Sequence, residues 1–123
     1  MKKNIETLTG KWIYEEDYGY GKAKGELLLT QEGGSLSGKI IFSENVNGEN
    51  SFMIQEIIEG EVRENRVYLK AVEYDIIHSE SEIEYELDTW QGTLVDEDLI
   101  EGESLDGQGI VGNFSFRKLK VKV

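Results

Sequence analysis

Hydrophobic and polar residues alternate along most of this chain, with a period of two residues. That period is typical of half-buried β-strands, whereas the helical period of 3.6 residues is almost absent. Residues 1–9 could form a short helical turn, and glycine-rich or polar stretches separate the alternating segments that follow. The pattern predicts eight strands, at Gly10–Tyr18, Gly25–Glu32, Ser35–Glu44, Ser51–Arg63, Arg66–Ile77, Ile83–Val95, Leu99–Leu105 and Ile110–Leu119.

Three tight turns join some of these strands in pairs and set the register of three predicted hairpins. The turns are Gly33-Gly34, Glu64-Asn65 and the three residues 96–98. The expected inward-facing pairs are Leu29 with Gly38, Leu27 with Ile40, Gly25 with Phe42, Val62 with Val67, Gly60 with Leu69, Ile58 with Ala71, Leu94 with Ile100, Gly92 with Gly102 and Trp90 with Ser104.

Glycine recurs beside these turns, at positions 38, 60, 92 and 102. A glycine within a strand often marks a sharp bend or the close approach of another group. Eight strands joined in sequence, with a repeated bend, favour an all-β fold, an eight-stranded antiparallel up-and-down (meander) barrel, over a sandwich. Closure also removes the exposed edges that an open eight-stranded sheet would have.

Strand direction alternates, so the tight turns share one end of the predicted barrel and the longer polar links share the other. We expect the tight-turn end to be a packed floor and the opposite end to be the mouth. The predicted floor consists of Trp12, Leu29, Leu36, Val62, Val67, Leu94, Ile100 and Phe116. A barrel of this size has an interior just wide enough for side chains or for one small ligand.

Gly10-Lys11-Trp12 resembles the G-x-W motif that opens lipocalins and other calycins, in which the tryptophan plugs the closed end of the barrel. Residues 89–92 are similar to a strand motif of avidins, and residues 113–117 resemble the last strand of small bacterial lipocalin-like domains. The resemblance covers about residues 10–119 and implies a lipocalin/avidin-like barrel that binds a small molecule, without specifying the molecule. It also implies a basic residue near the first tryptophan, and Arg117 is the candidate for such a structural cation–π cap.

The chain departs from these families in several respects. It has no lipocalin C-terminal helix, no disulfide and no convincing set of biotin-binding polar residues. Calycins also include a few enzymes and protein inhibitors, so the resemblance alone leaves the function open.

Length and composition limit the organisation of the chain. A chain of 123 residues predicts one domain with one core. We expect an N-terminal lead-in at residues 1–9, a single lipocalin-like barrel at 10–119 and a C-terminal tail at 120–123. The chain contains no cysteine, which excludes disulfide and thiol chemistry. Its net charge of −12 and the lack of a basic stripe argue against a nucleic-acid partner.

The chain shows no signal for membrane insertion, because no apolar run approaches the roughly 20 residues that a membrane helix needs. Met1-Lys2-Lys3 looks like the start of a signal peptide, but polar residues follow where the apolar region should begin. We therefore expect a cytoplasmic protein if Met1 is the native start. If the chain has been trimmed, we expect an exported protein, either periplasmic or secreted. The pattern leaves the oligomeric state open.

Glu56 is the most informative polar residue, because it shares its parity with hydrophobic neighbours midway along its strand. The hairpin register places Glu73 opposite it, and two facing carboxyls in a poorly solvated cavity would raise one pKa. Such a pair would suit a cationic ligand, a metal ion or general base chemistry. Alternatively, a bulge after Ala71 sends Glu73 outward and turns Tyr74 inward.

Several other inward-facing residues are expected near the mouth. The candidate ligand-binding residues are Glu16, Tyr18, Phe42, Phe52, Ile54, Glu56, Tyr74 and Tyr85. Aromatic walls with a few polar groups are typical of a ligand pocket. The alternatives are that the aromatic side chains simply fill the barrel and that Glu16 lies at a solvated strand end.

No other motif predicts chemistry. His78 is the only histidine and is expected in a polar loop, whereas a zinc site normally needs several histidine or cysteine ligands. The acidic stretch 96–103 fails the EF-hand spacing, because Glu101 stands where glycine is required. We therefore predict no catalytic residue, no metal and no cofactor.

Three functions are compatible with the pattern. The preferred one is a non-catalytic barrel that binds a small, partly apolar ligand. A calycin-type enzyme, such as an isomerase, cyclase or decarboxylase, would use Glu56 as acid or base. A protein-interaction or inhibitor domain would have a filled core and would use its loops, its acidic exterior and outward apolar residues such as Leu28, Ile41 and Ile57.

Overall fold

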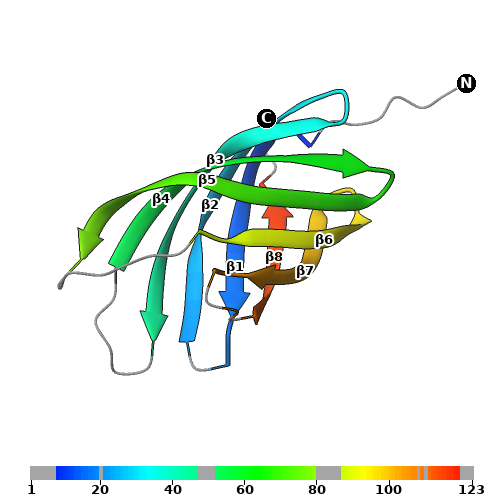
Figure 1. Ribbon diagram of the computed structural model, residues 1–123. Coiled ribbons are helices and arrows are strands. Elements are labelled where there is room, and N and C mark those ends of the chain that lie inside the picture. The colour runs from blue at the N-terminus through cyan, green and yellow to red at the C-terminus, as the bar shows by residue number, and fades with distance from the viewer. Residues whose placement is uncertain are drawn as a thin grey trace, which may run out of the picture.

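The computed structural model describes residues 8–19, 21–46, 52–79, 87–107, 109 and 111–119. Within these ranges the chain forms eight antiparallel strands, each paired with the next (Figure 1). They are β1 (Gly10–Asp17), β2 (Gly21–Glu32), β3 (Ser35–Val46), β4 (Phe52–Arg63), β5 (Arg66–Ser79), β6 (Thr89–Asp96), β7 (Leu99–Leu105) and β8 (Val111–Lys118). Because β8 also pairs with β1, the sheet closes into the meander barrel that the alternation predicted.

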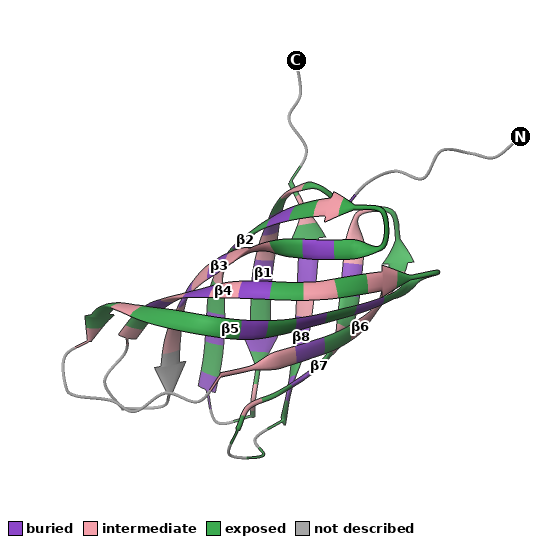
Figure 2. Cartoon of the chain, turned by 45° about the horizontal axis from the view of Figure 1, so that its top comes forward, coloured by how far each residue is buried: buried purple, intermediate pink, exposed green. Residues whose placement is uncertain are grey.

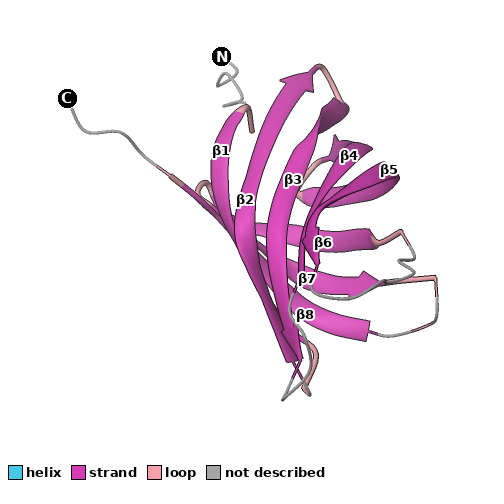
Figure 3. Cartoon of the chain, turned by 90° about the vertical axis from the view of Figure 1, so that its left-hand side faces the viewer, coloured by secondary structure: helices cyan, strands magenta, loops and turns pink. Residues whose placement is uncertain are grey.

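The strands cross one another at steep angles, and glycines within the strands make room for the neighbouring backbone. In Figure 3, β1–β3 run at a large angle to β6–β8. A Cβ at Gly38 would collide with the carbonyl oxygen of Leu28, and a Cβ at Gly60 would collide with that of Tyr68. Both obstacles belong to the backbone of the neighbouring strand, so these two predicted bends require glycine. Among the described residues, no helix has the length and apolarity needed to cross a membrane.

The nine inward-facing pairs predicted from the turns are pairs of the structure, although the register of β4 with β5 changes beyond Ile58 and Ala71. One turn is shorter than expected, because Glu97 and Asp98 alone form the turn between β6 and β7. A bulge at Val95 compensates for the missing residue, so Leu94 still pairs with Ile100.

Some strands extend further than the pattern predicted. β2 begins at Gly21, so the expected glycine-rich link is largely strand. β5 continues to Ser79, which places His78 on an exposed strand position and not in a loop. The expected lead-in turn and the tail lie almost entirely outside the described residues, and so does Tyr85.

The tight-turn end is a packed floor. Trp12 is completely buried there, and its indole Nε1 donates a hydrogen bond of 2.9 Å to the Leu8 carbonyl oxygen. The Leu8 amide donates in turn to Gln31 Oε1 at 2.7 Å, which holds the segment before β1 across this end. Buried and exposed positions alternate along the strands (Figure 2), as expected for side chains that point to opposite faces. All eight predicted floor residues are buried or half-buried.

The cation over Trp12 is Lys118, and the prediction of Arg117 was wrong. Lys118 Nζ lies 5.7 Å from the centroid of the Trp12 ring. The register pairs Trp12 with Lys118 and pairs Ile13 with Arg117, which is exposed. Arg117 came from the resemblance alone, and its parity is opposite to that of the inward-facing Phe114 and Phe116, whereas Lys118 shares theirs.

Candidate ligand-binding site

Tyr14 occupies the middle of the barrel and divides the floor from the region above it. Its ring packs edge-on against Phe42 and Trp90, with centroid distances of 5.4 and 6.3 Å, and lies 5.5 Å from Phe116. Aromatic pairs at such distances and angles are stabilising. Phe42 and the neighbouring Ile54 are buried in this layer, so both candidates are parts of the core.

Glu16 lies beyond this layer, where it is only 5% exposed. Its carboxylate accepts hydrogen bonds from the Tyr14 hydroxyl and from Ser104 Oγ. Gly112 provides the space, since a Cβ there would overlap the Glu16 carboxylate and crowd the Tyr18 ring. Burial raises the pKa of Glu16, while the two hydrogen bonds oppose this shift because they favour the charged form.

A second polar pair lies nearer the mouth. The Tyr18 hydroxyl donates a hydrogen bond to Glu44 Oε2, and both side chains are half-buried. Burial is the main cause that raises the pKa of the Glu44 carboxyl, and the negative charge of Glu16 adds to it. Burial also raises the pKa of the Tyr18 hydroxyl, followed by the charge of Glu44.

Glu56, midway along β4, faces inward as predicted and is 0% exposed. Neither of its carboxyl oxygens accepts a hydrogen bond from a described residue. Burial is the largest cause that raises the pKa of Glu56 to about 10, and the nearby Asp88 carboxyl is the next. The Asp88 carboxyl acts through its negative charge and as the hydrogen-bond partner to which the protonated Glu56 carboxyl donates. Glu56 is therefore protonated at neutral pH.

Glu73 does not face Glu56, so the predicted pair of facing carboxyls was wrong. A bulge follows Ala71 in β5, and the register beyond it pairs Glu56 with Tyr74. Glu73 is consequently exposed on the outer surface. One extra residue in a strand reverses the parity of the residues after it, and this is the alternative that the sequence left open.

The inner wall becomes accessible to solvent towards the mouth. Within the described residues, β6 pairs with β5 only over Arg66–Lys70, and the Ala71 amide donates a further hydrogen bond of 2.9 Å to the Asp88 carbonyl oxygen. Tyr74, which lies beside Glu56 in the register, is 42% exposed. The buried carboxyl of Glu56 therefore has solvent-accessible inner-face neighbours on its mouth side.

The structure brings together most of the predicted site residues. Glu16 and Glu56 share the interior with Tyr18, whereas Phe52 is half-buried against the core. The sequence argument missed Glu44, Asp88 and Ser104. The sequence did contain a signal for Glu44 and for Ser104, because Glu44 shares its parity with Phe42 and Ser104 was already paired with Trp90. We call Glu16, Glu44, Glu56 and Asp88 the mouth acids.

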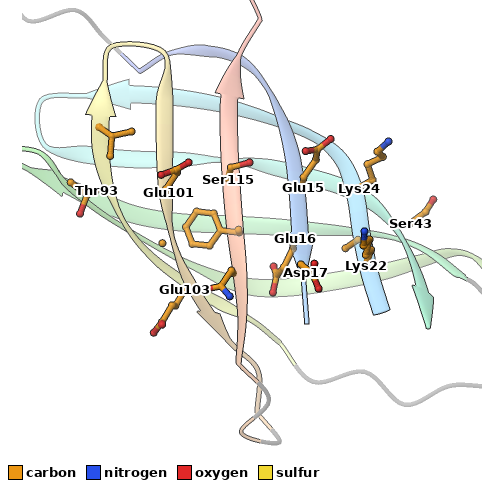
Figure 4. A pocket seen from close by; sticks show the side chains of 15 residues that line it. Glu15, Glu16, Asp17, Lys22, Lys24, Ser43, Thr93, Glu101, Glu103 and Ser115 are labelled. Carbon is orange, nitrogen blue, oxygen red and sulfur yellow. The ribbon is translucent and has the colours of Figure 1, made fainter. Parts of the chain in front are cut away.

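Two pockets are lined mostly by residues of the outer face of the barrel, although the buried Glu16, Ala23 and Phe114 also line the larger one. A groove of about 1140 Å³ crosses β1, β2, β7 and β8 (Figure 4), and a smaller one of about 400 Å³ lies over β6–β8. Exposed side chains of both charges line much of the larger groove, including Lys22 and Lys24 on one side and Glu101 and Glu103 on the other. Solvated charges of this kind need no further partner. The interior with the unpartnered Glu56 is therefore the stronger candidate site.

The mouth acids do not form a metal site. Across the part of the chain that the structure describes, no group of three or more histidine, aspartate or glutamate side chains is arranged to hold a metal ion. Hard cations such as Ca²⁺ need several oxygen atoms that converge within about 2.3–2.6 Å of one point.

Comparisons with known proteins identify the fold only. No protein-family model matches the chain, and no curated protein matches it. The redesigned β-barrel mFAP1, solved bound to DFHBI, aligns with a TM-score of 0.62 and 9% identity over 90% of this chain and 94% of its own. The redesigned barrel mFAP0, also bound to DFHBI, gives 0.58 and 10% identity, over 90% and 98% of the two chains. A de novo designed fluorescence-activating β-barrel gives 0.56 and 14% identity, over 91% and 94%. This chain is therefore similar to designed β-barrels in fold.

Proposed function

We propose that this protein binds a small, partly apolar molecule in the mouth half of its barrel and does not transform it. The observation that carries the proposal is Glu56, whose two buried oxygens accept no hydrogen bond from the described residues. Buried polar groups are normally hydrogen-bonded, and an unsatisfied one costs about 1–3 kcal/mol. A ligand that gave Glu56 a partner would recover this cost.

The surroundings of Glu56 support the same function. Tyr18, Phe52 and Tyr74 provide aromatic surface on the inner wall, and each is partly accessible to solvent. Aromatic walls with a few polar groups are the usual lining of a ligand site. Two barrels of similar fold, mFAP1 and mFAP0, hold the small molecule DFHBI.

We also infer that the barrel is a lipocalin-like domain of the calycin type. Trp12 of the G-x-W motif lies buried at the tight-turn end, where the resemblance implies a plug. A basic side chain, Lys118, lies over its ring. A ligand would therefore enter from the opposite end, where the inner wall is accessible.

A fragment screen by ligand-observed NMR tests the binding function. Fragments that bind should then shift the amide resonances of β4 and β5 around Glu56 and of β1 around Glu16. The amide and indole resonances of Trp12, at the sealed end, serve as an internal control and should shift little. Binding confined to the outer groove around Lys22 and Glu101, or no binding at all, would contradict the proposal.

Acid–base catalysis is a second candidate function, favoured by one observation. A general acid must hold a proton at the working pH, and the pKa of Glu56 of about 10 means that it does. Incubation of the protein with each bound fragment, followed by mass spectrometry, separates the two functions. An unchanged fragment supports binding alone, whereas turnover that disappears in Glu56→Gln supports catalysis.

A further inference from the structure

We propose that the ligand is an organic cation, a protonated primary or secondary amine with an aromatic or apolar body, whose ammonium group lies against Glu56 among the mouth acids. This inference rests on the proposed binding function and adds the chemical class of the ligand.

The charge of the interior is the first argument. The mouth acids come from four places in the fold, namely β1, β3, β4 and the residue that precedes β6. Among the described residues, the buried acidic side chains are Glu16 and Glu56, and no lysine or arginine is buried. The protein thus supplies acidic groups to its interior without a buried basic one. An anionic ligand would be repelled by those that are ionised, whereas a cation favours the ionised form of a neighbouring carboxyl and would be attracted.

The hydrogen-bonding capacity of Glu56 is the second argument. An ionised carboxylate can only accept hydrogen bonds, and it has about four sites at which to do so. An ammonium group can only donate them, so the two groups are complementary, and the bond between them is of the stronger, charge-assisted kind. A quaternary ammonium lacks N–H donors and would leave the Glu56 oxygens without partners. This selects primary and secondary amines.

The aromatic side chains supply the third argument. The face of a tyrosine or phenylalanine ring attracts a cation within about 6 Å, and the rest of the ring provides apolar contact. Tyr74 is paired with Glu56 across β4 and β5, whereas Phe52 lies four residues from Glu56 along β4, where its ring can contact the body of the ligand and not the ammonium group. An amine with an aromatic or apolar body would therefore meet complementary surface around the carboxyl. The lack of a metal-type cluster in the described region agrees with a cation of this size.

The release of one proton from Glu56 would accompany binding of the ligand. In the empty barrel Glu56 carries a proton, because burial and its neighbours raise its pKa to about 10. The arriving ammonium favours the ionised carboxylate, so the proton of Glu56 leaves to solvent while the amine keeps its own. The ionisable groups that influence this carboxyl or its acidic neighbours are Tyr14 and Glu16 of β1, Tyr18 directly after β1, Glu44 of β3, Asp88 before β6 and Asp106 after β7.

Isothermal titration calorimetry with three matched probes tests the inference. The probes are 2-phenylethylamine, 2-phenylethanol and 3-phenylpropionate, which share a ring and differ in the charge of the polar end. We expect the amine to bind at least about 10-fold more tightly than the alcohol, as one charge-assisted hydrogen bond predicts. The carboxylate should bind more weakly than either.

The pH dependence gives an independent readout. Between pH 6 and pH 8, release of one proton should raise the affinity for the amine by up to about 10-fold per pH unit. Titrations in buffers with different ionisation enthalpies should show the same release. Glu56→Gln should remove this dependence and weaken amine binding by about 10-fold or more, while affinity for the alcohol changes little. Glu73→Gln, which removes an exposed carboxyl from the adjacent strand, is the matched control and should behave as wild type.

The outcomes separate this inference from the function on which it rests. If the alcohol or the carboxylate binds as tightly as the amine, the assignment of the ligand as a cation is wrong, whereas the proposal of small-molecule binding stands. If none of the probes binds while the fragment screen yields other ligands, the amine class is wrong. If neither the probes nor any fragment binds the folded protein, both proposals fail. The comparison of the probes uses wild-type protein, so it does not depend on the folding of a variant.

Discussion

At the sealed end of the barrel, the buried indole Nε1 of Trp12 donates a hydrogen bond to the Leu8 carbonyl, whereas near the mouth both oxygens of the buried Glu56 accept none from the described residues. The first end follows the general rule that buried polar atoms are satisfied, and the second breaks it. Folding alone gives no reason to bring four carboxyl groups together. Such local violations are expected where a protein gives up stability for function.

The two ends also differ in how their walls are held. At the sealed end, the turns are tied to neighbouring strands by backbone hydrogen bonds, such as Val62 N to Gly34 O at 2.9 Å and Lys118 N to Asp98 O at 2.8 Å. Near the mouth, β5 continues past the last β6 residue with which it pairs. The sealed end therefore supports the fold, and the mouth has side chains available for a ligand.

The largest expected effect comes from removing the plug of the sealed end. Trp12→Ala should lower the free energy of unfolding by about 3–5 kcal/mol, the usual cost of truncating a fully buried aromatic residue. Phe52→Ala, which removes a half-buried ring near the mouth, should lower it by less than about 2 kcal/mol. Urea denaturation followed by circular dichroism measures both. Equal losses would show that the two ends do not differ in their contribution to stability.

The next effect concerns the mouth acids and reverses the usual pH dependence of stability. Glu56 has a pKa of about 10 in the folded protein and about 4.5 when unfolded, so the folded state binds more protons between these values. The stability that Glu56 contributes should accordingly be complete below about pH 4.5 and should fall by about 4 kcal/mol between pH 5 and pH 8. The burial-raised pKa values of Glu16 and Glu44 act in the same direction.

Thermal unfolding of Glu56→Gln between pH 5 and pH 8 measures this contribution. The variant should be more stable than wild type at pH 8 and should show a smaller decrease over the range. Glu73→Gln should keep the wild-type slope, because its carboxyl is exposed. A stability that rises with pH in the wild type would mean that the mouth acids are ionised and solvated.

Close strand crossing at the sealed end gives a third prediction. Gly60→Ala should destabilise the protein by about 1–3 kcal/mol, because the added methyl group meets the Tyr68 carbonyl oxygen of the paired strand. Gly34→Ala is the control, since its Cβ would lie 3.4 Å from the nearest atom, the Val62 carbonyl oxygen. Denaturant midpoints report the difference. A Gly60→Ala protein as stable as Gly34→Ala would show that β4 and β5 do not cross as closely as the structure has them.

The smallest effect distinguishes the two neighbouring basic residues at the end of β8. Lys118→Ala should cost about 0.5–1 kcal/mol through loss of the cation–π contact with Trp12. Arg117→Ala, which removes an exposed side chain, should change the free energy of unfolding by less than about 0.5 kcal/mol. The emission of Trp12 provides a second readout, because only the Lys118 substitution alters its surroundings. The opposite order would restore Arg117 as the cap.

Alternation and turn residues were sufficient to predict the closed eight-stranded meander, because each follows from local chemistry. A strand with one buried face must alternate, and a tight turn fixes which residues of two strands are opposite each other. The inward direction of Trp12, Glu16 and Glu56 followed from parity alone. The glycines at bends were also readable, since the strand interior otherwise disfavours glycine.

The tertiary structure decided the details that depend on a single extra residue or on distant partners. The pattern left open whether a bulge follows Ala71, and the structure has one, which places Glu73 outside and pairs Tyr74 with Glu56. The partners of the Glu16 carboxylate include Ser104, which lies 88 positions away in the chain. The sequence by itself determined which side chains point inward. Only closure of the barrel decided which of them meet, because contact across the interior depends on the accumulated register of all the strands between them.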